Sequence, residues 1–150
     1  MYIICLVCCR WKTVVLVLHK ELEKITDALL SAAEQGDSAA YTKQYANLLA
    51  LCYEYSEEEQ NHPLQWEILA DFTEEPQEAI SFYQKALGFA DEIQDFAALY
   101  SSQMSLANLY QDIEQQDEAR MAANIALDYA EILKDKSLLA ETEAFIKSLG

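Results

Sequence analysis

Carboxylates are the side chains with the most capacity for chemistry in this chain, because they are numerous and concentrated. The sequence holds 26 Asp and Glu residues against 10 Lys and Arg, a net charge of −16. From Gln44 to Ala119, sixteen acidic residues accompany a single base, Lys85. A surface of this sign repels nucleic-acid phosphates and attracts basic ligands through charge-assisted hydrogen bonds. The composition therefore favours a basic partner over nucleic acid; the alternative is that the charge only keeps the protein soluble.

Groups that could act as nucleophile, general base or metal ligand are few. His19 and His62 are the only histidines, and no HExxH, GxSxG, GxGxxG or P-loop pattern occurs. The segment CLVCC contains a CxxC, but no second Cys or His pair follows at zinc-binding spacing. The sequence thus predicts no enzyme, no catalytic residue, no metal and no cofactor. Its few cysteines are typical of reduced thiols, which indicates a cytoplasmic location.

The elements that must position the carboxylates are indicated by a ten-residue phrase that occurs three times. It is ALLSAAEQGD from Ala28, ALGFADEIQD from Ala86 and ALDYAEILKD from Ala126. Each copy has Ala-Leu at the start, Ala at the fifth position and Asp at the tenth. The interval between the first two copies is longer than the interval between the last two. Repetition at a period of roughly 20–50 residues predicts an array of stacked helices, an architecture that presents binding surfaces.

Apolar spacing from Val14 onward predicts an all-α chain of seven helices with short connections. Gly36 ends the first helix, and a polar run ending in Pro63 forms a loop from Ser56. The expected helices begin near residues 14, 39, 64, 76, 95, 117 and 135–137, and the last ends near residue 149. The tyrosines of the second helix fall at helical spacing, which favours core packing over an aromatic binding cluster; they are Tyr41, Tyr45, Tyr53 and Tyr55.

Residues 1–13 form an apolar N-terminal segment of uncertain role. Arg10 and Lys12 interrupt it, so neither half reaches the ~20 apolar residues that a membrane span needs. Three interpretations stay open: a buried helix or strand that caps the array, a lipid anchor on Cys8 and Cys9, or translated sequence upstream of the natural start. The helical domain is predicted to cover residues 14–150.

Two sets of residues resemble the tetratricopeptide repeat, in which a small residue on one helix meets a large one on the next. One set is Leu106-Ala107-Asn108-Leu109-Tyr110 with Ala119 and Ala126; the other is Trp66, Leu69 and Ala70 with Ala79 and Ala86. Thr73 and Gln103 depart from the usual aromatics, and the period from Ala86 to Ala126 is similar to that of the long-repeat variant in kinesin light chain and LGN-type scaffolds. The resemblance implies a right-handed α-α superhelix of about three helical hairpins plus a C-terminal capping helix.

The same resemblance implies a concave groove lined by the first helix of each hairpin. The positions that match are Glu67, Asp71, Ser101, Met104, Asn108, Gln111, Asp112 and Glu141. Asn108 falls where the family often places an amide that grips a peptide backbone. The family's carboxylate clamp of Lys and Arg is replaced by Glu67 and Met104, so an acidic groove for a basic peptide or helix is expected. For each residue the alternative is an ordinary solvated face or ordinary packing.

The sequence therefore predicts a protein–protein interaction module, a scaffold or chaperone whose partner is another protein. The alternative function is a homo-oligomeric structural repeat protein that assembles through its apolar N-terminal segment. No membrane span and no nucleic-acid partner are expected.

Overall fold

The computed structural model describes residues 3–56 and 61–150 of the chain. These residues form seven α-helices and no strand, which confirms the all-α class. The predicted loop from Ser56 to Pro63 lies partly outside the described residues, as do the side chains of residues 3–15, including the cysteines considered for lipid attachment. The helices are α1 (Ile3–Gln35), α2 (Ser38–Glu54), α3 (Pro63–Asp71), α4 (Pro76–Glu92), α5 (Phe96–Asp112), α6 (Gln116–Leu133) and α7 (Lys136–Ser148).

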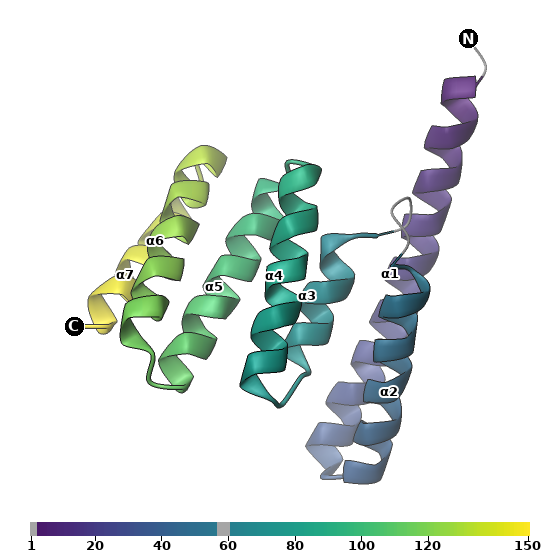
Figure 1. Cartoon of the computed structure of the whole chain (residues 1–150), viewed down its shortest axis with the longest axis horizontal. Coiled ribbons are helices and arrows are strands. Elements are labelled where there is room, and N and C mark those ends of the chain that lie inside the picture. The colour runs from purple at the N-terminus through teal and green to yellow at the C-terminus, as the bar shows by residue number, and fades with distance from the viewer. Residues whose placement is uncertain (1–2, 57–60) are drawn as a thin grey trace.

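The helices form three antiparallel hairpins, α1–α2, α3–α4 and α5–α6, and α7 packs on α6 (Figure 1). The hairpins lie side by side, so each helix contacts mainly its neighbours in sequence, and α3 also touches α1 and α5. The first hairpin is uneven, because α1 has 33 residues and α2 has 17. The N-terminal part of α1 projects beyond the other helices, and the helix has no break between residues 13 and 14.

The repeated ten-residue phrase has the same structural role in all three copies: it ends one helix and begins the next. Its ninth residue adopts the left-handed conformation that stops a helix, with φ of 66° at Gly36 and 56° at both Gln94 and Lys134. The backbone N–H of the tenth residue then donates to the carbonyl of the fifth, as in Asp95 to Ala90 at 2.9 Å. This left-handed turn with its backward bond is the Schellman motif.

The aspartate at the tenth position also caps the helix that follows. The side chains of Asp37, Asp95 and Asp135 accept hydrogen bonds from backbone N–H groups in the first turns of α2, α5 and α7. The phrase therefore encodes a corner between two helices. Its first copy closes α1, the first helix of a hairpin, whereas the other two close α4 and α6, the second helices of theirs. The first interval therefore spans one helix more than the second, which explains why it is the longer one.

Helices α4 and α6 are equivalent when the copies that start at Ala86 and Ala126 are aligned. Three alanines of α4 match three alanines of α6, and none is more than 2% exposed: Ala79, Ala86 and Ala90 correspond to Ala119, Ala126 and Ala130. Ala107 on α5 is also fully buried. Because a methyl group keeps the helix surface flat, neighbouring helices approach closely at these positions. The prediction that these alanines lie at helix contacts is confirmed.

Leucine at an alanine contact should overpack the array. Ala126→Leu is expected to lower the free energy of unfolding by about 1–3 kcal/mol, because the buried site has no room for the larger side chain. Urea unfolding followed by circular dichroism measures the change. Ala140→Leu on α7 is the matched control, since Ala140 is exposed. Equal stability of the two variants would contradict close packing at Ala126.

The start of α6 differs from the prediction. The sequence indicated Asp117 as its first residue, but the helix begins at Gln116 after an N-cap at Gln115. Glu114 adopts a φ of 62°, and the N–H of Gln115 bonds to the Tyr110 carbonyl, so α5 ends by the same turn without the phrase. Asp117 lies instead in the first turn of α6, where a carboxylate complements the helix dipole.

A helix that spans a membrane must be both long and apolar. Within residues 3–56 and 61–150, none of the helices combines the length and apolar character that crossing a bilayer requires.

Candidate functional site

A cavity of about 260 Å³ lies between the C-terminal ends of α3 and α5, with α4 as its third wall. Three of the predicted groove residues line it: Asp71 from α3, and Asn108 and Asp112 from α5. Asn108 and Asp112 are one helical turn apart, so they share a face of α5. The remaining lining residues are Ala70, Thr73, Ala79, Tyr83, Ser105 and Leu109. The structure thus brings together two carboxylates and an amide from separate helices.

Tyr83 on α4 fixes the position of the Asp71 carboxyl. Its buried hydroxyl donates a hydrogen bond of 2.5 Å to Asp71 Oδ1. Burial raises the pKa of the Asp71 carboxyl, and the hydrogen bond from Tyr83 lowers that pKa in part. Burial also raises the pKa of the Tyr83 phenol, and the neighbouring Asp71 raises it further. Asp71 is exposed as a residue, so its carboxylate is held against Tyr83 while its other lone pairs can accept from a ligand.

Glu67 and Ser101 meet beside the cavity and link α3 to α5. The Ser101 hydroxyl donates to Glu67 Oε1. Burial raises the pKa of the Glu67 carboxyl, the bond from Ser101 lowers it, and the charge of Asp71 raises it again. Glu67 lies one helical turn before Asp71, so the two carboxylates extend one acidic surface along α3.

The other predicted groove residues lie outside the cavity lining. Met104 is half-buried and packs with Tyr100 and Ala126, because an apolar side chain on this face of α5 is drawn into the contact with α6 and α7. Gln111 is half-buried on α5, and Glu141 is exposed on α7. The site brought together by the structure is therefore shorter than the predicted groove and is centred on the ends of α3 and α5.

Asn108 uses one of its side-chain N–H donors within its own helix. Its Nδ2 donates to the carbonyl of Met104, one turn earlier in the same helix, at 2.8 Å. This bond uses one N–H of Nδ2 and leaves the second N–H and the acceptor Oδ1, so the grip on a peptide backbone, which needs a donor and an acceptor together, stays a prediction.

Tyr83 is a residue of the site that is not among the predicted groove residues. Its spacing with Phe82 and Ala86 matches the buried face of α4, and it is indeed buried. The residue type itself indicates a polar contact, because a buried tyrosine hydroxyl usually has a hydrogen-bond partner. The nearest candidates for that partner were the acids of α3. Thr73 and Ser105 complete the polar part of the lining and carried no comparable signal.

Comparison with known proteins gives no further assignment: no family model matches the chain, and no curated protein matches it.

Proposed function

We propose that this chain is a protein–protein interaction module of the tetratricopeptide-repeat type, which binds a basic segment of another protein in the cavity between α3 and α5. The observation that carries the proposal is the convergence of Asp71, Asn108 and Asp112 on one cavity. Carboxylates accept charge-assisted hydrogen bonds from Lys and Arg, and the Asn108 amide oxygen accepts from a peptide N–H. The net charge of the whole chain, −16, favours the same kind of ligand.

A selection from a displayed library of random peptides tests this proposal. The protein should enrich peptides that are rich in Lys and Arg, and the double variant Asp71→Lys/Asp112→Lys should not retain them. Asp128→Lys/Glu131→Lys is the control of equal charge change, because both residues are exposed on α6, away from the cavity. Peptides without a basic preference, or equal loss in both variants, would count against the cavity as the binding site.

The affinity for a selected basic peptide should fall as the pH is lowered from 7.5. Only the ionised carboxylate attracts the peptide, and the raised pKa of Asp71 means that it takes up its proton at a higher pH than the ordinary 3.8. Glu67 shifts in the same direction. Calorimetric titration at several pH values measures the trend. The Asp71→Asn variant should bind more weakly at pH 7.5 and respond less to pH, whereas the same pH dependence in the variant and in the wild type would contradict the role of Asp71.

One observation favours self-association as a second candidate function. The N-terminal part of α1 projects from the array, and it carries Leu16 and Val17 at 56% and 44% exposure. A second copy of the chain could cover these side chains. Light scattering after size-exclusion chromatography decides the matter: a dimer that becomes monomeric on Leu16→Ser/Val17→Ser supports it, and a monomeric wild type argues against it.

A further inference from the structure

A second cavity, of about 250 Å³, lies on the other side of the α3–α4 turn, between that turn and α2. Its lining combines aromatic rings, hydroxyl groups and three closely spaced acids: Tyr41, Thr42, Tyr45, Phe72, Thr73, Glu74, Glu75 and Glu78. A neighbouring cavity shares Tyr41, Thr42 and Glu74 and extends to Asp37 at the α1–α2 turn. Thr73 is the residue that this second cavity shares with the α3–α5 cavity.

The aromatic wall of this cavity is held in place by two hydrogen bonds. The hydroxyl of Tyr41 donates to the carbonyl of Phe72 at 2.9 Å. The hydroxyl of Tyr45 lies 2.9 Å from Oγ1 of Thr73. Tyr41 and Tyr45 are one turn apart on α2, and both are half-buried. Their rings are thus preorganised beside the cavity, because the phenol oxygens are bound to the end of α3 and the turn that follows it.

The three glutamates of the cavity lining differ in their interactions. Glu75 is the N-cap of α4 and accepts a hydrogen bond from the backbone N–H of Glu78 at 2.7 Å. Glu74 and Glu78 are exposed, and their negative charges act on the two tyrosines. Burial is the largest cause of the raised pKa of both phenols, and Glu74 raises the pKa of Tyr41 further while Glu78 does so for Tyr45. Glu74 and Glu78 also line the cavity beside the two tyrosines.

We propose that this cavity binds the guanidinium group of an arginine side chain of another protein. A guanidinium is planar and weakly hydrated, stacks on aromatic rings and pairs its fork of N–H donors with carboxylates. Those are the groups that Tyr41, Tyr45, Glu74 and Glu78 supply. An ammonium group is more strongly hydrated and lacks the plane that stacks. The proposal goes beyond the α3–α5 cavity, and it holds whether or not that cavity binds a peptide.

An anion is a poor occupant of the same space. The N-termini of α2 and α4 border the two neighbouring cavities and would favour negative charge if they were uncapped. Asp37 and Glu75 already place a carboxylate at these ends, where they accept from the backbone N–H groups of Ala40 and Glu78. Glu74 and Glu78 then leave an excess of negative charge, which selects a cation.

Titration with N-acetyl-arginine methylamide, followed by amide chemical shifts in NMR spectra, tests the proposal. Shifts should concentrate in residues 41–45 and 72–78, and the dissociation constant should rise roughly tenfold or more in Glu74→Gln/Glu78→Gln. N-acetyl-lysine methylamide should bind more weakly. Asp71→Asn/Asp112→Asn is the control that removes the acids of the other cavity, and it should leave these shifts in place.

Three results would overturn the proposal: shifts centred elsewhere, an unchanged dissociation constant in Glu74→Gln/Glu78→Gln, or equal binding of the lysine compound. Circular dichroism of each variant verifies that it is folded. Because the Asp71→Asn/Asp112→Asn variant is measured in parallel, failure of this site and failure of the α3–α5 site give different patterns.

Discussion

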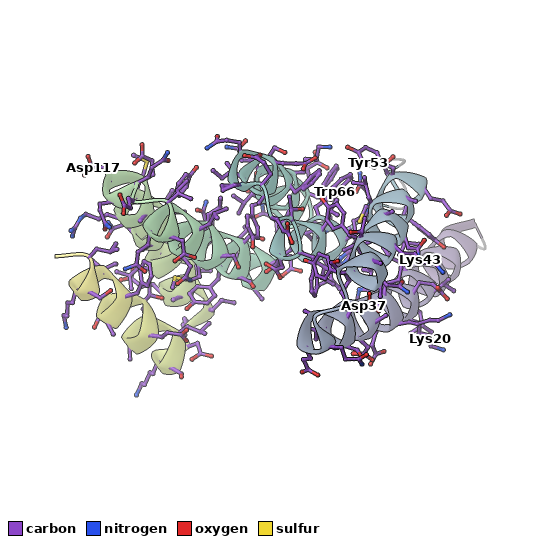
Figure 2. All side chains as sticks on the ribbon, turned by 90° about the horizontal axis from the view of Figure 1, so that it is seen from below. Lys20, Asp37, Lys43, Tyr53, Trp66 and Asp117 are labelled. Carbon is purple, nitrogen blue, oxygen red and sulfur yellow. The ribbon has the colours of Figure 1, made fainter. Side chains whose placement is uncertain are left out.

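Trp66→Ala is expected to lower the free energy of unfolding by about 3–5 kcal/mol, the range for removing a large buried aromatic residue. Trp66 is only 2% exposed and lies where α2, α3 and α4 meet. Its ring contacts Tyr53 edge-on at 5.6 Å between centroids and stacks with Phe82 at 6.1 Å. Figure 2 shows Tyr53 and Trp66 next to each other. The variant therefore loses the packing that joins the first two hairpins.

Two further interactions of Trp66 make the loss specific to this side chain. Its Nε1 donates to Asn61 Oδ1 at 2.6 Å, and the Lys85 ammonium lies 4.3 Å from its ring centroid. Trp66→Phe keeps a ring over which Lys85 can lie but loses the N–H donor, so it should cost less than Trp66→Ala. Urea unfolding followed by circular dichroism compares the two. A cost below about 1 kcal/mol for Trp66→Ala would show that this ring does not hold the hairpins together.

Gln65→Ala should cost about 2–4 kcal/mol of unfolding free energy, because it leaves several polar backbone groups without their partner. The Gln65 side chain is fully buried. Its Nε2 donates to the carbonyls of Cys52 at 2.9 Å and Tyr55 at 3.3 Å, and its Oε1 accepts from the backbone N–H of His62 at 3.2 Å. The same side chain thus completes the capping box of α3 and ties that helix to the end of α2.

Gln84→Ala on α4 provides the control for this substitution, since Gln84 is exposed. It should change the unfolding free energy by a few tenths of a kcal/mol at most. If Gln65→Ala proved as mild as Gln84→Ala, the buried hydrogen bonds of Gln65 would not be what joins α2 to α3.

The helices and their corners could be predicted well from the sequence, because the signals are local. Apolar spacing gave the helix positions to within a few residues from α2 onward. Gly36 and Pro76 mark ends that depend on backbone conformation, and Asp95 marks one that its side chain caps. The repeated alanines were assigned to helix contacts because small residues have few other uses in a regular pattern, and their burial confirms this. The handedness of the superhelix and the family stay predictions.

The candidate site was less predictable, because it depends on which faces of distant helices meet. Asp71 and Asp112 are far apart in the sequence, and only the packing of α3 beside α5 brings them to one cavity. Met104 was placed in the groove by its position in the family pattern, but its apolar character draws it toward α6 and α7. Tyr41 and Tyr45 were expected in the core; they are half-buried, and they also line a cavity that no local pattern indicated.

The first hairpin shows why the repeats could not be assigned from the ten-residue phrase alone. The phrase from Ala28 looks like those from Ala86 and Ala126, yet it closes α1 within a hairpin instead of between hairpins. A turn motif depends on the local backbone conformation and does not determine how the next helix packs. For this reason the longer interval from Ala28 to Ala86 could not be resolved into repeats before the helices were placed.

Locating a bound basic peptide on the protein tests the proposed binding site most directly. A Lys- and Arg-rich peptide from the selection, carrying a nitroxide label at one end, broadens the NMR signals of nearby amides. The strongest broadening is expected at the ends of α3 and α5, around Asp71 and from Asn108 to Asp112. Strongest broadening on the outer face of α6, around Met121 and Ile125, would contradict it.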